Sequence, residues 1–182
     1  MTFWYSEYIR GGSTQNLRQL KIFRRRFRIP YSEFKELLTE LETAVMFREW
    51  RPNHTDAAGD AVSPLSLLLL GALRYLGRGW TFDDIEEATA IGKETHRRFF
   101  HRFIDYGSKI LFDRYVIFPT TAAEASTHMH EYIIAGFPGT PCSTDATHVS
   151  MDKCPNLLRH VNKGPKKDLP SRTYNLSCNH RK

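Results

Sequence analysis

The sequence predicts a mainly α-helical fold: a helical bundle with a helix-turn-helix, followed by the first β-strands of a truncated α/β domain. Apolar residues recur at helical spacing over most of residues 16–107. The longest apolar run, "PLSLLLLGALRYLG", meets Arg74 well short of the about 20 residues that a membrane span needs, so we expect a buried helix and no membrane partner. Residues 141–153 and 172–180 instead alternate by two, which is typical of strands.

Composition and charge divide the chain into three predicted regions. Residues 1–60 are basic helices with a linker, residues 61–118 are a second helical region, and residues 119–182 begin the α/β domain. The net charge of +6 favours an anionic partner, with nucleic acid ahead of a membrane surface. Residues 1–30 hold seven basic side chains against one acidic, and residues 153–182 hold eight against one. Three scattered cysteines indicate a reducing compartment.

Two short helices joined by a glycine turn are predicted over residues 82–107. Thr81 and Asp84 have the spacing of a capping box before the first helix, and "IG" separates it from the second. The pattern fits a DNA-binding helix-turn-helix, and it also fits an ordinary helical hairpin with a solvated basic face. The first helix is acidic and would face away from phosphates. The candidate DNA-binding residues lie on the second helix: Lys93, His96, Arg97, Arg98 and Arg102.

Asp145 stands near the head of the first alternating stretch, "STDATHVSMD", although Asp is depleted in strands. On a regular strand Asp152 would lie about 23 Å away on the opposite face, and His148 would also face away from Asp145. Asp145 is therefore either a strand-entry residue or a metal ligand whose partners lie on other strands.

Longer segments resemble the plant-transposon-protein group of PIF/Harbinger transposases. They are "GFPGTPCSTDATHVSMDKCP", followed by "NKGPKKDLPSRTYNLSCNHRK". Upstream, "SPLSLLLLGALRYLGRGWTFDDIEEATAIGKETHRRFFHRF" is similar to the helical, helix-turn-helix-bearing region of that family. The sequence departs from the family at Ala146, where glycine is usual.

The resemblance implies an RNase H-like domain and a DDE-type nuclease that cleaves and transfers DNA strands. Three carboxylates would hold two divalent ions, Mg²⁺ or Mn²⁺, and Asp145 matches the first carboxylate. The second, in a "WND"-like stretch, and the third have no counterpart here. We therefore expect the N-terminal part of a transposase, DNA-binding but catalytically incomplete. The alternative is a transposase-derived DNA-binding or interaction protein with no nuclease role.

The family also implies a nuclear location, DNA as partner and a separate Myb-like DNA-binding protein. Between the two predicted strands lies a basic loop, which is either a solvated loop or a phosphate contact beside the active site. Its candidate DNA-binding residues are Lys163, Lys166 and Lys167.

Overall fold

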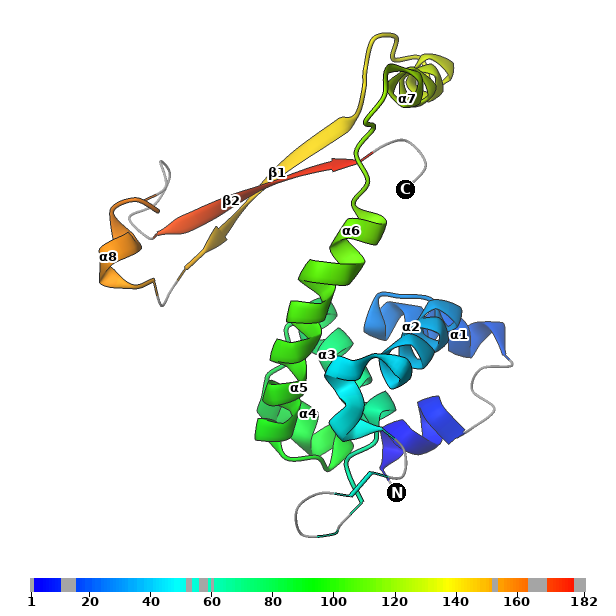
Figure 1. Ribbon diagram of the computed structural model, residues 1–182, viewed down its shortest axis with the longest axis vertical. Helices are drawn as coiled ribbons and strands as arrows, with labels where there is room; N and C mark the ends of the chain where they lie inside the picture. The colour runs from blue at the N-terminus through cyan, green and yellow to red at the C-terminus, as the bar shows by residue number, and fades with distance from the viewer. Residues whose placement is uncertain are drawn as a thin grey trace. The chain divides into compact units, whose positions relative to one another are not determined.

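The computed structural model describes residues 2–10, 16–51, 54–55, 59, 61–151, 154–163 and 170–178. It forms two compact units, residues 1–116 and residues 117–182. Helices dominate the described residues, and the sheet among them has two antiparallel strands (Figure 1). The prediction of a mainly α fold is confirmed.

The first unit is helical throughout. Its elements are η1 (Tyr5–Arg10), α1 (Leu17–Phe27), α2 (Tyr31–Thr43), η3 (Val45–Trp50), α3 (Leu65–Arg78), α4 (Phe82–Thr89), α5 (Lys93–Tyr106), η4 (Gly107–Leu111) and α6 (Phe112–Tyr115). Figure 1 shows α5, η4 and α6 following one another as a continuous rod. Gly107 keeps a helical backbone, so the rod continues without a break to Tyr115.

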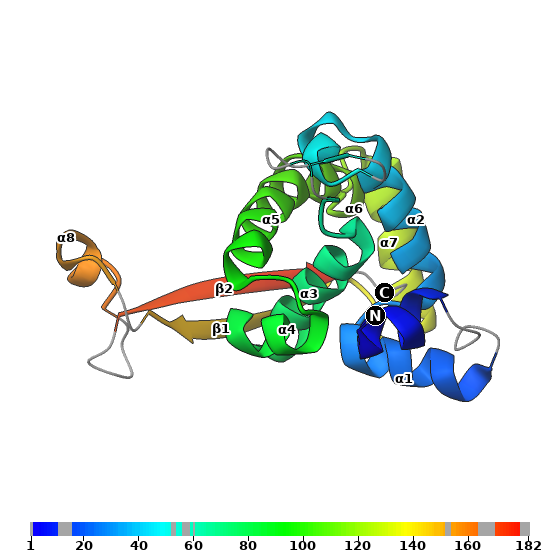
Figure 2. The same cartoon turned by 90° about the horizontal axis from the view of Figure 1, so that it is seen from below.

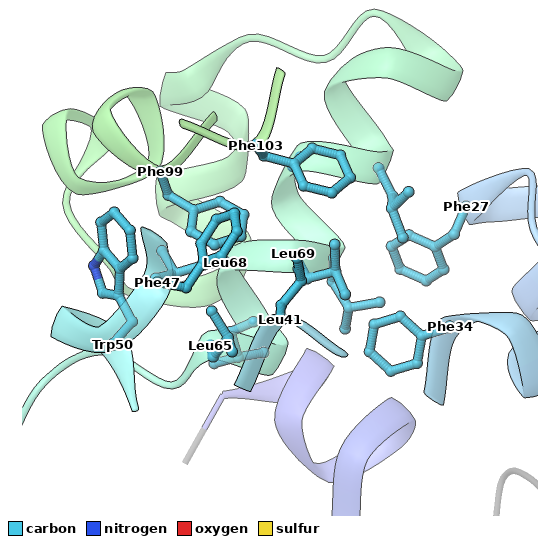
Figure 3. Close-up of a cluster of buried hydrophobic side chains, with 14 of the residues drawn as sticks. Phe27, Phe34, Leu41, Phe47, Trp50, Leu65, Leu68, Leu69, Phe99 and Phe103 are labelled. Carbon is cyan, nitrogen blue, oxygen red and sulfur yellow. The ribbon is translucent and has the colours of Figure 1, made fainter. Parts of the chain in front are cut away.

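The core of this unit surrounds α3. Its sequence is apolar on nearly every side, and its leucines from Leu65 to Leu73 are buried. Helices α1, α2, α4 and α5 all contact α3 (Figure 2). Figure 3 shows Leu65, Leu68 and Leu69 in the middle of the cluster, with aromatic rings from α1, α2, η3 and α5 around them. The basic helices α1 and α5 are thus each fixed by an apolar face packed on this core.

Two helices begin directly after prolines. Pro30 and Pro64 take the cap positions of α2 and α3, although Ser32 and Ser63 lie close by, and neither helix start has a side-chain cap bond. Val45, which directly follows α2 and its C-cap Ala44, is 73% exposed. The extended backbone of Ala44 ends α2 and turns the chain into η3 before that residue is reached.

The second unit contains α7 (Ala122–Ile134), β1 (Ser143–Ser150), α8 (Asn156–Arg159) and β2 (Ser171–Cys178). The two strands pair antiparallel, from Ser143 opposite Cys178 to Ser150 opposite Ser171. The Tyr132 hydroxyl of α7 lies 2.9 Å from the Ser143 hydroxyl and donates to the Cys178 carbonyl over 3.0 Å. This buried tyrosine therefore holds the end of the sheet next to Asp145. The short helix α8 falls where a loop was expected.

Candidate nucleic-acid interface

A tight connection joins α4 to α5. The Thr81 hydroxyl and the Asp84 carboxylate form the expected capping box at the start of α4. Ala90 ends that helix in the left-handed region at φ 55°, and the buried Ile91 follows it. Gly92 then caps α5. The connection is three residues long, so the two helices are rigidly linked.

His96 belongs to the core rather than to the surface of α5. It is 2% exposed, and its Nε2 lies 2.8 Å from the Thr89 hydroxyl, which donates to the Ile85 carbonyl. Its ring lies so close to α3 that a Cβ added at Gly71 would come within 2.7 Å of Nδ1. Burial lowers the pKa of His96 to about 4, which keeps the ring neutral near pH 7. The prediction that His96 binds DNA is therefore wrong.

Lys93 and Arg97 are exposed near the start of α5, but carboxylates already pair with both. Lys93 Nζ donates to Asp83 Oδ1 over 3.0 Å, and this hydrogen bond raises the pKa of Lys93. Arg97 Nη1 lies 2.7 Å from Glu94 Oε1. Asp83 and Glu94 therefore neutralise much of the positive charge expected at the N-terminal end of α5.

Arg98 and Arg102 both bind η3. Arg98 Nη2 lies 3.7 Å from Glu49 Oε2, and Arg102 Nη1 binds the other oxygen of the same carboxylate. Arg102 also donates to the Met46 carbonyl over 3.1 Å. Both guanidinium groups lie over the Trp50 ring, at 5.6 Å and 5.1 Å from its centroid. These contacts clamp α5 to η3, so the two arginines have a structural role independent of any ligand.

The basic residues of α1 were not assigned a role from the sequence, yet they differ sharply from those of α5. Arg18, Lys21, Arg24 and Arg25 are exposed. Among the described residues, no carboxylate forms an ion pair with any of these four. A sequence signal did exist, because no acidic residue occurs between Glu7 and Glu33.

Asp145 is exposed on β1, directly opposite Leu176 of β2. His148 pairs with Thr173 and lies 2.9 Å from its hydroxyl, so it faces away from Asp145 as predicted. The nearest neighbours on the Asp145 face carry no carboxylate: Ser143, Thr147, Tyr174, Leu176 and Cys178.

These residues do not fit a pair of divalent ions. Magnesium binds through oxygen ligands and gives up its water reluctantly, so a two-ion site needs several converging carboxylates. In the part of the chain that the structure describes, no three His, Cys, Asp or Glu side chains gather in metal-binding geometry. Asp145 can supply one ligand, and the described residues do not complete the set.

The basic loop is described in part. The backbone of Lys163 pairs with that of Pro170, and Ser171 N–H donates to the Asn162 carbonyl over 2.7 Å, which closes the loop at its base. Lys166 and Lys167 lie outside the described residues.

Comparisons of the chain with protein families, with curated proteins and with solved structures find no match. Across the described ranges, no helix has the length and apolar character needed to cross a bilayer. The two units therefore offer separate chemistry. In the first, the exposed cations of α5 pair with carboxylates, whereas Arg18, Lys21, Arg24 and Arg25 of α1 form no ion pair with the described residues. In the second, β1 exposes the Asp145 carboxylate.

Proposed function

We propose that the chain is the DNA-binding N-terminal portion of a Harbinger-type transposase, and that it does not cut DNA by itself. In this proposal α4 and α5 form a helix-turn-helix, and β1 and β2 are the first strands of an RNase H-like domain. The chain would act in the nucleus, with a Myb-like protein as a further partner. The quoted sequence segments suggested this function, and the arrangement of β1 and β2 supports it.

The observation that carries the proposal is the open pair of strands that presents Asp145. Nearly every residue of β1 and β2 is exposed on both faces, including the apolar Val149 and Leu176 at 49% and 65%. A sheet of two strands is marginally stable alone and gains stability from further strands or a covering helix. An exposed carboxylate on such a pair suits one ligand of a metal site that other elements would complete.

A second candidate is a DNA-binding or interaction protein without any nuclease role. The absence of a second carboxylate on the Asp145 face, among the residues described, favours it. Both candidates require DNA binding, and they differ in whether Asp145 ever takes part in strand cleavage.

One experiment on the whole chain tests both points. Supercoiled plasmid is incubated with the protein in Mg²⁺ or Mn²⁺ and scored for nicks, while binding to a labelled duplex is followed over a range of salt concentrations. We expect binding that weakens steeply with salt, and no nicking. Lack of binding at low salt would refute the function. Nicking that disappears in Asp145→Ala would show that the metal site is complete.

A further inference from the structure

We infer that the outward face of α1, and not that of α5, contacts the phosphates of duplex DNA. The α1 cationic face is defined by Arg18, Lys21 and Arg25. The inference rests on the proposed DNA-binding function and assigns that function to a surface that the sequence motif does not indicate.

Helical geometry places these three side chains together. Phe23 and Phe27 are 3% and 1% exposed, so they fix which side of α1 faces the core. At about 100° per residue, Arg18, Lys21 and Arg25 fall on the opposite side. Their Cα atoms span about 10 Å along the helix axis. The result is a short row of cations on a rigid support.

An open hollow beside this row adds two more cations. It measures about 400 Å³, and its lining includes Lys21 and Arg24 of α1 and Lys35 of α2. Lys35 Nζ lies 5.5 Å from the centroid of the Tyr31 ring, which also lines the hollow. Among the described residues, no carboxylate forms an ion pair with any of these three cations, so an entering phosphate would have none to displace from them.

Further positive charge gathers where α1 contacts α3, at Arg26, Arg74 and Arg78. Arg74 donates to the Arg26 carbonyl over 3.0 Å, and its guanidinium lies 4.1 Å from the centroid of the Trp80 ring. Burial lowers the pKa of Arg74, and the like charges of Arg78 and Arg26 lower it further. An anion near this cluster would relieve the repulsion between these guanidinium groups.

The exposed cations of α5, unlike those of α1, are already paired with carboxylates among the described residues. A phosphate approaching Lys93, Arg97 or Arg98 meets the carboxylates that pair with them. Glu86 of α4 adds further negative charge at the start of α5, where its carboxylate accepts from the Lys93 backbone N–H over 3.0 Å. Repulsion from these groups offsets the attraction of the cations.

A nucleic acid fits the α1 cationic face better than an anionic membrane does. A helix that lies on a membrane inserts an apolar face between the lipids. The apolar face of α1 is instead packed into the core through Phe23 and Phe27. The phosphate-rich surface of a duplex requires only the cations.

The test compares two triple variants of the full chain that remove equal charge. One is Arg18→Ala with Lys21→Ala and Arg25→Ala. The other is Lys93→Ala with Arg97→Ala and Arg98→Ala. Affinity for a fluorescent duplex is measured by anisotropy at several salt concentrations, and tryptophan fluorescence checks that each variant is folded. Vesicles containing phosphatidylserine serve as the membrane probe.

We expect the α1 variant to bind about 10-fold more weakly or worse, and the slope of log affinity against log salt to fall by about 3. The α5 variant should lose clearly less affinity than that. Equal losses, or a larger loss in the α5 variant, would overturn the inference and leave the proposed function standing. Failure of the unaltered protein to bind DNA would overturn both. Tighter binding to the vesicles than to the duplex would exclude nucleic acid as the preferred partner.

Discussion

Buried His96 should make the stability of the helical unit fall as the solution becomes acidic. The pKa of its ring is lowered by burial from an ordinary value of 6.5 to about 4. The unfolded chain therefore takes up a proton at a pH where the folded chain does not. Because the folded-state pKa is the lower one, this contribution to stability is present above pH 6.5 and is lost as the pH falls toward 4.

The size of the effect follows from the two pKa values. Proton linkage with 6.5 in the unfolded state and about 4 in the folded state lowers the free energy of unfolding by about 2 kcal/mol between pH 7 and pH 5. Glu40 and Asp84 should contribute little in this window. Hydrogen bonds from Arg114 and from Thr81 lower the pKa values of Glu40 and Asp84, which stay ionised throughout.

Urea unfolding followed by tryptophan fluorescence measures this directly, because Trp4, Trp50 and Trp80 all lie in the first unit. His96→Gln cannot take up the proton and should show a flat stability over the same pH range. His101→Gln, at an exposed position of the same helix, is the matched control and should keep the dependence. Unchanged stability of the unaltered protein between pH 7 and pH 5 would show that burial does not lower the pKa of His96. A pH dependence that survives in His96→Gln would show that another group causes it.

Three further predictions concern single substitutions. Gly71→Ala should lower the free energy of unfolding by about 1–3 kcal/mol, because the new Cβ would lie 2.7 Å from the His96 ring. Gly107 is a helical glycine with open space around it, so Gly107→Ala should raise the free energy of unfolding by about 1 kcal/mol. Urea midpoints that move in the opposite directions would contradict these two predictions. Tyr132→Phe removes the hydroxyl bound to both strands, at a cost of about 1 kcal/mol, and should speed hydrogen exchange at the Ser143 end of β1. Unchanged exchange there would show that the tyrosine does not hold the sheet.

The apolar spacing was sufficient to predict most helices, because a helix that packs on a core repeats its apolar residues about every 3.6 positions. The capping box of Thr81 and Asp84 was also readable, since both partners lie within one turn. The helix starts after Pro30 and Pro64 could not be predicted in the same way. Serine is a favoured N-cap residue type, but which residue takes the cap position depends on how the preceding chain enters the core.

The candidate site was harder to predict for a different reason. The burial of His96 could have been predicted from the spacing of apolar residues, because Phe99 and Phe103 lie three and seven residues later on the same helix face. The pairing of Arg98 and Arg102 with Glu49 could not have been predicted from the sequence. Glu49 is distant from both arginines along the chain, and only the fold brings η3 to α5. Counting charges along the chain could therefore locate basic helices but could not show which of them remain unneutralised.

Chemical modification of lysines is a direct test of whether the α1 cationic face binds DNA. An amine-reactive reagent is applied to the unaltered protein with and without duplex DNA, and mass spectrometry measures the rate at each lysine. We predict that DNA slows modification of Lys21 and Lys35 more than that of Lys93 and Lys109. Protection of Lys93 with Lys21 left fully reactive would contradict it.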